Sequence, residues 1–305
     1  MKRLQSAASQ RRFALQQRER GRQIGFVPTM GAFHEGHLAL IRKARSQCDV
    51  VVVSIFVNPL QFGPQEDFTR YPRDLARDMD RARELGVDVV FVPEVEEIYP
   101  EGFATKVSVG PLAQKLCGVS RPEHFDGVCT VVLKLIGIVQ PHRLYLGEKD
   151  RQQVIILQRM VRDLNVDVKI VPVPTVREKD GLAYSSRNRY LSAEQRALAP
   201  RLYESLRLAQ RAILVGGVRD PQELRRMMQA HIREGDPPLQ IEYLALVDPE
   251  TLEPLPVLTG RVLIALAAEL GRARLIDNLL INVPGGRMAE GIAHQRKGAS
   301  GTERG

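Results

Sequence analysis

Short apolar runs alternate with amphipathic stretches through most of the first 175 residues. The runs are rich in Val and Ile, as parallel strands buried on both faces are. We therefore expect strands at 24–29, 50–57, 87–92, 144–146 and 168–173. Between them, apolar residues three and four positions apart predict helices at 37–47, 74–85, 128–139 and 152–164. Repeated strand–helix–strand units favour a doubly wound, Rossmann-like parallel α/β sheet, whose ligands bind beyond the carboxyl ends of the strands.

The pattern changes near residue 174, where a polar, glycine-bearing stretch begins. A capping box from Ser192 to Gln195 predicts the start of a long helix, and Asp220 before a proline predicts the start of a second one. β-like segments follow these two helices, at 239–247 and 261–270. We therefore predict a Rossmann-like domain, a smaller α+β domain and a Gly-rich basic tail that is disordered, over 1–176, 177–283 and 284–305.

The composition is that of an ordinary globular protein, with 44% hydrophobic and 26% charged residues. No apolar run reaches the roughly 18 to 20 residues that a membrane-spanning helix needs, so we expect no membrane partner. The three cysteines, Cys48, Cys117 and Cys129, are scattered and predict no disulfide framework. This cysteine usage suits a cytoplasmic protein.

The net charge of +8 is compatible with either nucleic acid or acidic small molecules as ligands. Much of the excess charge lies near the two ends, at 1–22 and 287–304, and the chain has no Trp and only 5% aromatic residues. The chain therefore offers few aromatic side chains on which bases could stack, and we expect no nucleic-acid partner. The Arg-rich N-terminal segment also resembles a transit peptide, but its spacing favours a first helix that leads directly into the first strand.

Residues 28–37 read PTMGAFHEGH and lie where the first predicted strand turns into a helix. If the helix begins here, His34 and His37 share one face at its N-terminus, where free backbone N–H groups attract phosphate. Gly36 between them has no side chain to block a ligand. Such a site can stabilise the charge that develops when the α-phosphorus of a triphosphate is attacked, so the motif predicts adenylyl transfer.

The same histidine spacing also occurs in metal sites and on ordinary helix surfaces. A zinc site would lack its third ligand, because no His-Glu-x-x-His follows and the cysteines form no Cys-x-x-Cys pair. We therefore expect no zinc site and assign no metal ligands. The chain has neither a phosphate loop nor a GxGxxG fingerprint, which removes the main support for a kinase or a dehydrogenase.

Two other polar segments offer groups that bind phosphate. GEKDRQQ at 147–153 follows a short predicted strand, and YSSRNR at 184–189 lies just past the predicted domain boundary. Lys149 provides a compact mobile charge and Arg187 a planar fork, while the adjacent serines can donate to phosphate oxygens. Each segment alone is also typical of a solvated loop or a linker.

Two glutamines provide neutral amides near the same predicted edge of the sheet. Gln61 follows the strand at 50–57, and Gln153 belongs to the segment at 147–153. An amide both donates and accepts hydrogen bonds without adding charge, so the pair can hold the hydroxyl and carboxylate groups of a small polar acid. Taken alone, Gln61 is an ordinary turn residue.

In combination these motifs resemble those of one enzyme family. PTMGAFHEGH at 28–37, SIFVNPLQF at 54–62, HFDGV at 124–128, GEKD at 147–150 and SSRN at 185–188 match the pantothenate synthetases, or pantoate-beta-alanine ligases, in order and spacing. RLIDN at 274–278 closes the resemblance, which covers about residues 5 to 282. It implies the fold of the nucleotidyltransferases and class I synthetases. It also implies ATP-dependent condensation of (R)-pantoate with beta-alanine through a pantoyl-adenylate, with Mg²⁺, to give pantothenate, AMP and diphosphate.

The resemblance also implies roles for individual residues. His37 would be the proton donor, with His34 and Lys149 as further catalytic residues. Gln61 would hold pantoate and beta-alanine, and Gln153 would hold pantoate. The ATP site would be formed by Met30, Gly31, Ala32, Phe33, His34, Glu35, Gly36, His37, Gly147, Glu148, Lys149, Asp150, Val176, Tyr184, Ser185, Ser186 and Arg187. Members of the family are usually cytoplasmic homodimers, and the smaller domain is expected to close on the ATP site.

Two other functions stay open at this point. A nucleotidyltransferase that releases a stable nucleotide conjugate shares the histidine motif, but its product keeps the nucleotide, whereas the ligase releases AMP. A basic nucleic-acid-binding module shares the positive charge, and its affinity would fall steeply with salt.

Overall fold

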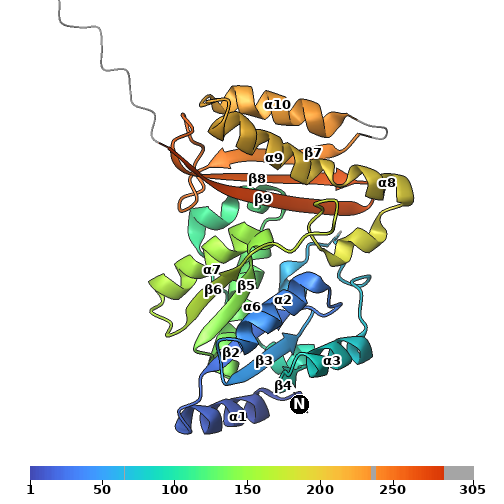
Figure 1. Cartoon of the computed structure of the whole chain (residues 1–305). Coiled ribbons are helices and arrows are strands. Elements are labelled where there is room, and N and C mark those ends of the chain that lie inside the picture. The colour runs from blue at the N-terminus through green and yellow to red at the C-terminus, as the bar shows by residue number, and fades with distance from the viewer. Residues whose placement is uncertain (65, 235–237, 285–305) are drawn as a thin grey trace, which may run out of the picture.

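The computed structural model describes residues 1–64, 66–234 and 238–284. Two sheets divide the molecule into two parts, with a six-stranded parallel sheet below and a three-stranded antiparallel sheet above (Figure 1). The predicted fold class, a parallel α/β sheet followed by a smaller α+β unit, is confirmed. The predicted basic tail lies outside the described residues apart from Pro284.

The parallel sheet has the strand order β1-β4-β3-β2-β5-β6. Its strands are β1 (Lys2–Leu4), β2 (Ile24–Thr29), β3 (Val50–Ile55), β4 (Val89–Phe91), β5 (Arg143–Gly147) and β6 (Lys169–Val173). The chain runs outward from β2 through β3 to β4 and then returns to β5 on the other side of β2, so the order reverses between β2 and β5. Ligands of such sheets bind in the crevice at this reversal.

Five of these strands follow the predicted apolar runs, but β1 was not predicted. It precedes the first helix and pairs with β4, so the expectation that the first strand directly follows that helix is wrong. Two of its three residues are Lys2 and Arg3, and a short charged strand at the edge of a sheet has no apolar pattern to reveal it.

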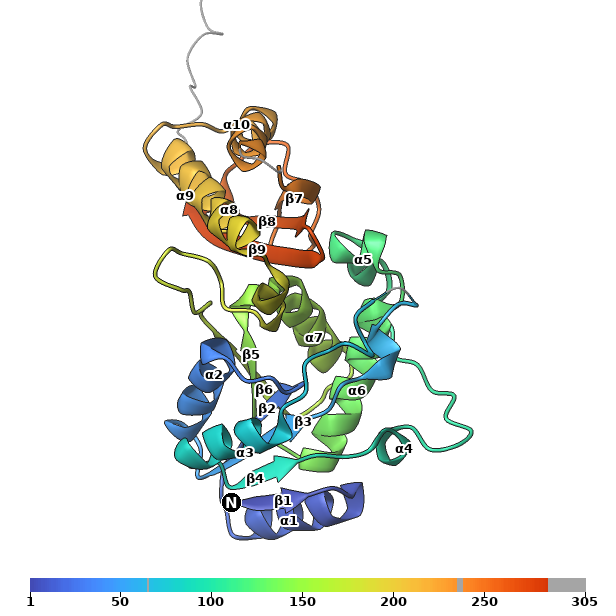
Figure 2. The same ribbon diagram turned by 90° about the vertical axis from the view of Figure 1, so that its right-hand side faces the viewer.

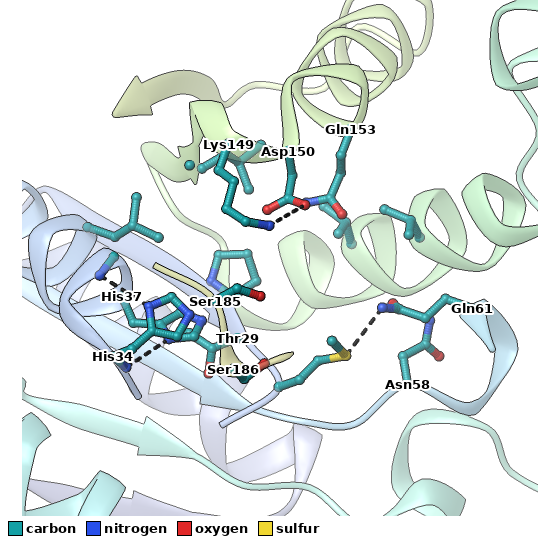
Figure 3. A pocket seen from close by; sticks show the side chains of 18 of the residues that line it. Thr29, His34, His37, Asn58, Gln61, Lys149, Asp150, Gln153, Ser185 and Ser186 are labelled. Atoms are coloured by element: carbon teal, nitrogen blue, oxygen red, sulfur yellow. Dashed lines mark hydrogen bonds and ion pairs between the residues drawn. The ribbon is translucent and has the colours of Figure 1, made fainter. Parts of the chain in front are cut away.

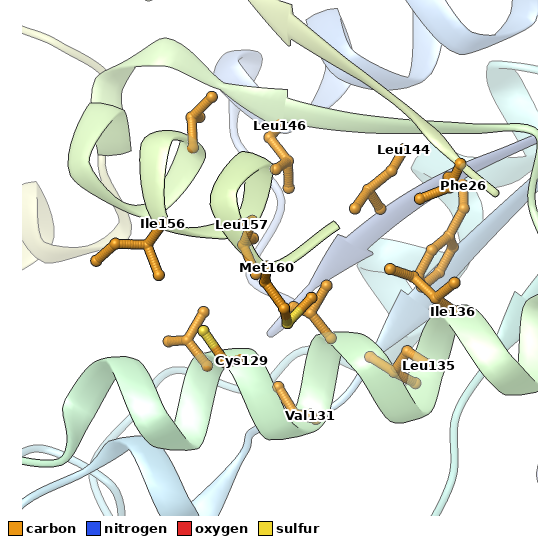
Figure 4. Close-up of a cluster of buried hydrophobic side chains, with 14 of the residues drawn as sticks. Phe26, Cys129, Val131, Leu135, Ile136, Leu144, Leu146, Ile156, Leu157 and Met160 are labelled. Atoms are coloured by element: carbon orange, nitrogen blue, oxygen red, sulfur yellow. The ribbon is translucent and has the colours of Figure 1, made fainter. Parts of the chain in front are cut away.

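Helices cover both faces of the parallel sheet (Figure 2). α1 (Ala7–Glu19), α6 (His124–Val139) and α7 (Arg151–Asp163) pack on one face, and α2 (Glu35–Arg45) and α3 (Leu75–Glu84) pack on the other. Figure 4 shows the core between α6, α7 and the sheet, where Leu144 and Leu146 meet Leu157 and Met160. The shorter elements of this part are η1 (Pro59–Gln61), α4 (Val95–Ile98), η2 (Gly110–Gln114), α5 (Cys117–Ser120) and η3 (Glu148–Asp150).

The antiparallel sheet has the order β7-β8-β9. Its strands and the preceding helices are η4 (Ser186–Tyr190), α8 (Ala193–Leu198), α9 (Arg201–Leu214), α10 (Pro221–Arg233), β7 (Gln240–Val247), β8 (Gly260–Leu270) and β9 (Ala273–Val283). Side chains of α9 and α10 form one core with one face of the sheet. The other face contributes Leu263 and Ala265 to the core of the lower part, so this sheet lies between its own helices and the parallel-sheet part.

Two predictions for this upper part need correction. The capping box at Ser192 is present, but it opens the short α8 rather than a long helix, and α9 begins after Pro200. Proline lacks the N–H that would continue the helix through this point, so three helices precede the sheet instead of two. β9 was not predicted as a strand. No helix within the described residues is long and apolar enough to span a bilayer.

Candidate active site

A cavity of about 240 Å³ opens at the carboxyl ends of β2 and β5, where the strand order reverses. It brings together segments that lie far apart in the sequence. The predicted site residues that line it are Met30, His34, Gly36, His37, Gln61, Gly147, Lys149, Asp150, Gln153, Val176, Tyr184, Ser185, Ser186 and Arg187. Figure 3 shows His34 and His37 at one end of the cavity, Gln61 at the other, and Lys149 and Gln153 between them.

Five predicted ATP-site residues do not line this cavity: Gly31, Ala32, Phe33, Glu35 and Glu148. Ala32 and Phe33 are buried against protein. The two glutamates form ion pairs with neighbouring arginines instead. Glu35 pairs with Arg42 at 3.1 Å, and Glu148 pairs with Arg151 at 2.6 Å.

The two histidines cap the helix that they begin. His34 is the N-cap of α2, and its Nδ1 accepts from the backbone N–H of Gly36 at 3.2 Å. His37 Nδ1 accepts in turn from the backbone N–H of His34 at 3.3 Å, and the two ring centroids are 4.1 Å apart. Because each Nδ1 accepts a hydrogen bond, the proton of each neutral ring is on Nε2. Both rings therefore have an Nε2–H to donate.

Burial keeps both rings uncharged. It lowers the pKa of His34 to about 4, with a smaller contribution from the positive charge of Lys149. Burial also lowers the pKa of His37 well below its usual value, helped by His34 and Lys149. At neutral pH the histidines are hydrogen-bond donors rather than cations, and Lys149 is a positive charge close to both rings.

A buried carboxylate holds the segment that carries the histidines, which we call the histidine loop (residues 30–37). Asp78 of α3 accepts the backbone N–H groups of Ala32 and Phe33, each at 2.7 Å. Ala32 adopts a left-handed φ of 52°, an uncommon conformation for a residue with a side chain. Burial raises the pKa of Asp78, while the two N–H donors act in the opposite direction.

Gly36 is required by the ring of His34 itself. A Cβ at this position would lie 2.9 Å from Cε1 of His34, so a side chain would displace the N-capping imidazole. The sequence interpretation attributed this glycine to the approach of a ligand. The structure adds a reason within the helix cap.

Gln61 is oriented by contacts on both sides of its amide. Its Oε1 accepts from Asn58 Nδ2 at 3.1 Å, and its Nε2 lies 3.2 Å from Met30 Sδ. Asn58 is almost fully buried, accepts from the hydroxyl of Tyr99 at 2.7 Å and donates to the carbonyl of Gly127 at 3.1 Å. The amide of Gln61 is therefore held on the cavity wall before any ligand binds.

An apolar wall from α6 completes this end of the cavity. One face of the helix, with Val128, Val131, Val132 and Leu135, lines the cavity opposite the polar groups. These side chains belong to the main hydrophobic core, so they are rigidly supported. This wall offers apolar contact to the aliphatic part of a bound ligand.

The residues from Tyr184 to Arg187 reach across the cavity to the lower part. Ser186 Oγ lies 3.3 Å from the Tyr71 hydroxyl, and Arg187 pairs with Asp67 at 3.0 Å. The ring of Tyr184 stacks on that of His34 at 6.3 Å between centroids. This segment therefore covers the histidine loop.

Comparison with known proteins shows what this arrangement is similar to. A family model described as pantoate-beta-alanine ligase matches residues 2–280. The pantothenate synthetase of Moorella thermoacetica is 54% identical over 283 residues, which are 93% of this chain and 99% of that protein. The crystal structure of pantothenate synthetase from Thermus thermophilus has a TM-score of 0.85 and 50% identity, covering 92% of this chain and 99% of that one.

The chain belongs to the pantoate-beta-alanine ligase family. The resemblance inferred from the motifs is thereby confirmed, and with it the prediction of an ATP-dependent ligase that condenses pantoate with beta-alanine. A further ligase structure, from Francisella tularensis, was determined in complex with beta-gamma ATP and beta-alanine. It has a TM-score of 0.76 and 37% identity, covering 92% of this chain and 97% of that one.

Several residues of this ligase were missed in the sequence. Asp78 is an acidic residue in the first turn of a helix, where such residues are common, so nothing in the sequence distinguishes it. His124 lies in the HFDGV motif at 124–128, but the sequence suggests no role for it. Its Nδ1 donates to the carbonyl of Gln61 at 2.7 Å and its Nε2 lies 3.2 Å from Arg121, so it supports the backbone beneath the glutamine.

Within the described residues of the ligase, no three His, Cys, Asp or Glu side chains converge to hold a metal ion. Asp150 is the carboxylate of the predicted set that lines the cavity, 3.8 Å from Lys149 Nζ. A single carboxylate suits Mg²⁺, which usually keeps several waters and binds substrate phosphates with only one or two protein ligands.

Proposed function

We propose that this cavity carries out both halves of the ligase reaction. In the first half, a carboxylate oxygen of pantoate attacks the α-phosphorus of ATP, and the bond to the departing diphosphate breaks. In the second, the amine of beta-alanine attacks the acyl carbon of the adenylate, loses a proton, and AMP leaves. One observation supports this assignment most strongly. A single cavity has two histidine donors at one end, an amide with an apolar wall at the other, and a cation and a second amide between them.

Donor groups at the histidine end would bind ATP. Neutral Nε2–H groups of His34 and His37 can donate to phosphate oxygens without the cost of burying two charges. The family resemblance implies that His37 is the proton donor, and we assign to its Nε2–H the role of donor to the reacting phosphate. Lys149 would neutralise the charge that grows on the departing diphosphate.

The amide end would bind pantoate. Gln61 and Gln153 can pair with its hydroxyl and carboxylate groups, and the α6 wall can pack against its aliphatic carbons. Gln61 would also contact beta-alanine when that substrate follows.

Mg²⁺ would enter with the nucleotide. Asp150 is the side chain placed to hold it, together with phosphate oxygens and water. A bound Mg²⁺ supplies charge neutralisation on the phosphates.

The domain boundary would lie between Val176 and Arg177. Val176 lines the cavity, whereas Arg177 pairs with Asp277 of the antiparallel sheet. We propose that ATP draws the segment from Tyr184 to Asn188 closer, which would shield the adenylate from water. Hydrogen exchange of this segment should slow with saturating ATP and Mg²⁺. Unchanged protection would leave the segment as an ordinary linker.

We also propose a cytoplasmic homodimer. The three cysteines are buried free thiols, which suits a reducing compartment. The dimer follows from the family resemblance, and light scattering of the purified protein tests it. A mass equal to one chain would contradict it.

One assay tests the proposed reaction against its rivals. Pantoate, ATP and beta-alanine should give equal amounts of AMP and pantothenate, and omission of beta-alanine should leave only an enzyme-bound adenylate. A released product that keeps the nucleotide would instead support a nucleotidyltransferase. Absence of turnover together with salt-sensitive nucleic-acid binding would support a binding module.

A further inference from the structure

The RLIDN segment contacts the ATP side of the cavity, although no role follows for it from the reaction. Asn278 belongs to β9 of the antiparallel sheet. Its Nδ2 donates to the carbonyl oxygens of Glu148 and Lys149, each at 2.9 Å. These carbonyls belong to residues 147–150, which we call the lysine turn. One side chain of the upper part thus holds the backbone that carries Lys149.

Only an amide side chain suits this contact. Its NH₂ group has two hydrogens in one plane, so one nitrogen can satisfy two carbonyls at once without adding charge. A carboxylate of the same size would place negative charge against both oxygens. A serine could satisfy at most one of them.

Asn278 is itself held by a chain of charged contacts. Its backbone N–H donates to Asp277 Oδ1 at 2.8 Å. Arg177 binds both carboxylate oxygens of Asp277, at 2.6 and 2.9 Å, and its guanidinium lies 3.7 Å above the ring of Tyr203. Asp277 is almost completely buried, so this bidentate pair is shielded from solvent. Movement of Asn278 relative to its sheet would break these contacts.

We propose that Asn278 is a positioning residue for Lys149. The antiparallel sheet thereby sets where the ammonium group stands in the cavity. This inference rests on the proposed role of Lys149 at the departing diphosphate. It predicts that loss of the amide slows the first half-reaction more than it weakens pantoate binding. The reason is that a misplaced Lys149 stabilises the transition state less, whereas pantoate is bound by other groups.

A double-mutant cycle tests this positioning role. Asn278→Asp should lower kcat by about tenfold or more, and Lys149→Ala should lower it by at least as much. If Asn278 acts through Lys149, adding Asn278→Asp to the Lys149→Ala protein should change kcat by less than about twofold. An equal loss in both backgrounds would overturn the inference. An unchanged kcat for Lys149→Ala would instead overturn the proposed role of the lysine.

A milder variant and hydrogen exchange distinguish a loss of positioning from a loss of folding. Asn278→Ser retains one donor and should give an intermediate kcat at a thermal midpoint close to that of the parent. Faster hydrogen exchange at 148–152 in this variant would support loosening of the lysine turn, and unchanged exchange would contradict it. Asn282 lies exposed on the same strand, so Asn282→Asp serves as the matched control with unchanged kcat.

Discussion

The histidine loop and the lysine turn face the same cavity but are anchored in opposite ways. Asp78 holds the histidine loop through two backbone N–H groups, whereas Asn278 holds the lysine turn through two backbone carbonyls. Asp78 lies on α3, which packs on the same parallel sheet as the loop. Asn278 lies on β9 of the other sheet. The loop is therefore fixed within one part of the molecule, and the turn is fixed where two parts meet.

The two anchors hold groups of different charge, because the histidines are neutral donors and Lys149 is a cation. The histidines are uncharged, and contacts within the lower part of the molecule fix their positions. The backbone that carries the ammonium of Lys149 is held by Asn278 of the antiparallel sheet. Any motion between the two parts would therefore change the electrostatics of the cavity more than its hydrogen-bonding geometry.

The largest expected effect comes from removing a donor of the histidine loop. His37→Ala should lower the rate of adenylate formation by about 10² or more, and His34→Ala should do the same, because each removes one transition-state donor. Single-turnover formation of the adenylate measures this step. His231→Ala, on the distant α10, is the control and should leave the rate unchanged. A His37→Ala protein with the parent's rate would show that the loop does not act on the phosphates.

A smaller loss should follow from weakening the anchor of the loop. Asp78→Asn exchanges one acceptor for a donor and leaves a buried N–H of Ala32 or Phe33 unpaired. We expect a loss of about 1–3 kcal/mol in the free energy of unfolding and a rate lowered by about tenfold. Urea unfolding and kcat measure the two effects. Asp80→Asn on the exposed side of α3 should change neither. An Asp78→Asn protein with the stability and kcat of the parent would mean that the loop needs no anchor.

Gln153 tests whether the region after the lysine turn serves pantoate rather than ATP. Gln153→Ala should raise the KM for pantoate by about tenfold with ATP binding largely unchanged, because the lost partners are those of the acid. Gln158→Ala, exposed on the same helix, is the matched control. Equal weakening of both ligands would place Gln153 in the nucleotide site instead.

The smallest effect is the contribution of His34 to the pH dependence of stability. The pKa of His34 falls to about 4 in the folded protein, below its ordinary value of 6.5. The unfolded chain therefore binds more protons between these values, so stability should fall as the pH drops from 6.5 toward 4. His34→Asn keeps a good N-cap but cannot titrate. The number of protons taken up on unfolding should then be smaller by about one. The slope of the free energy of unfolding against pH, measured by urea unfolding at pH 5 to 7, gives this number. An unchanged slope would mean that the pKa of His34 is not lowered in the native state.

Much of the parallel sheet follows from local pattern. The Val-rich run that became β3 is buried on both faces, and no other local structure satisfies such a sequence as well. The elements that were missed have weak local signals. β1 is short and charged, and Pro200 interrupts a helix whose apolar spacing continues on both sides.

Residues close together in the chain, or motifs in a characteristic order, were enough to predict most of the elements, the two histidines at a helix N-terminus and the family. Which distant groups hold the histidine loop and the lysine turn is decided only by the tertiary structure. Asp78 and Asn278 are separated by many residues from the backbone groups that they bind. The sequence gives no role to Asp78, and it marks Asn278 only as part of a motif, until folding sets each side chain against backbone N–H or C=O groups. The cost of leaving those groups unsatisfied makes both side chains important, and that cost exists only in the folded protein.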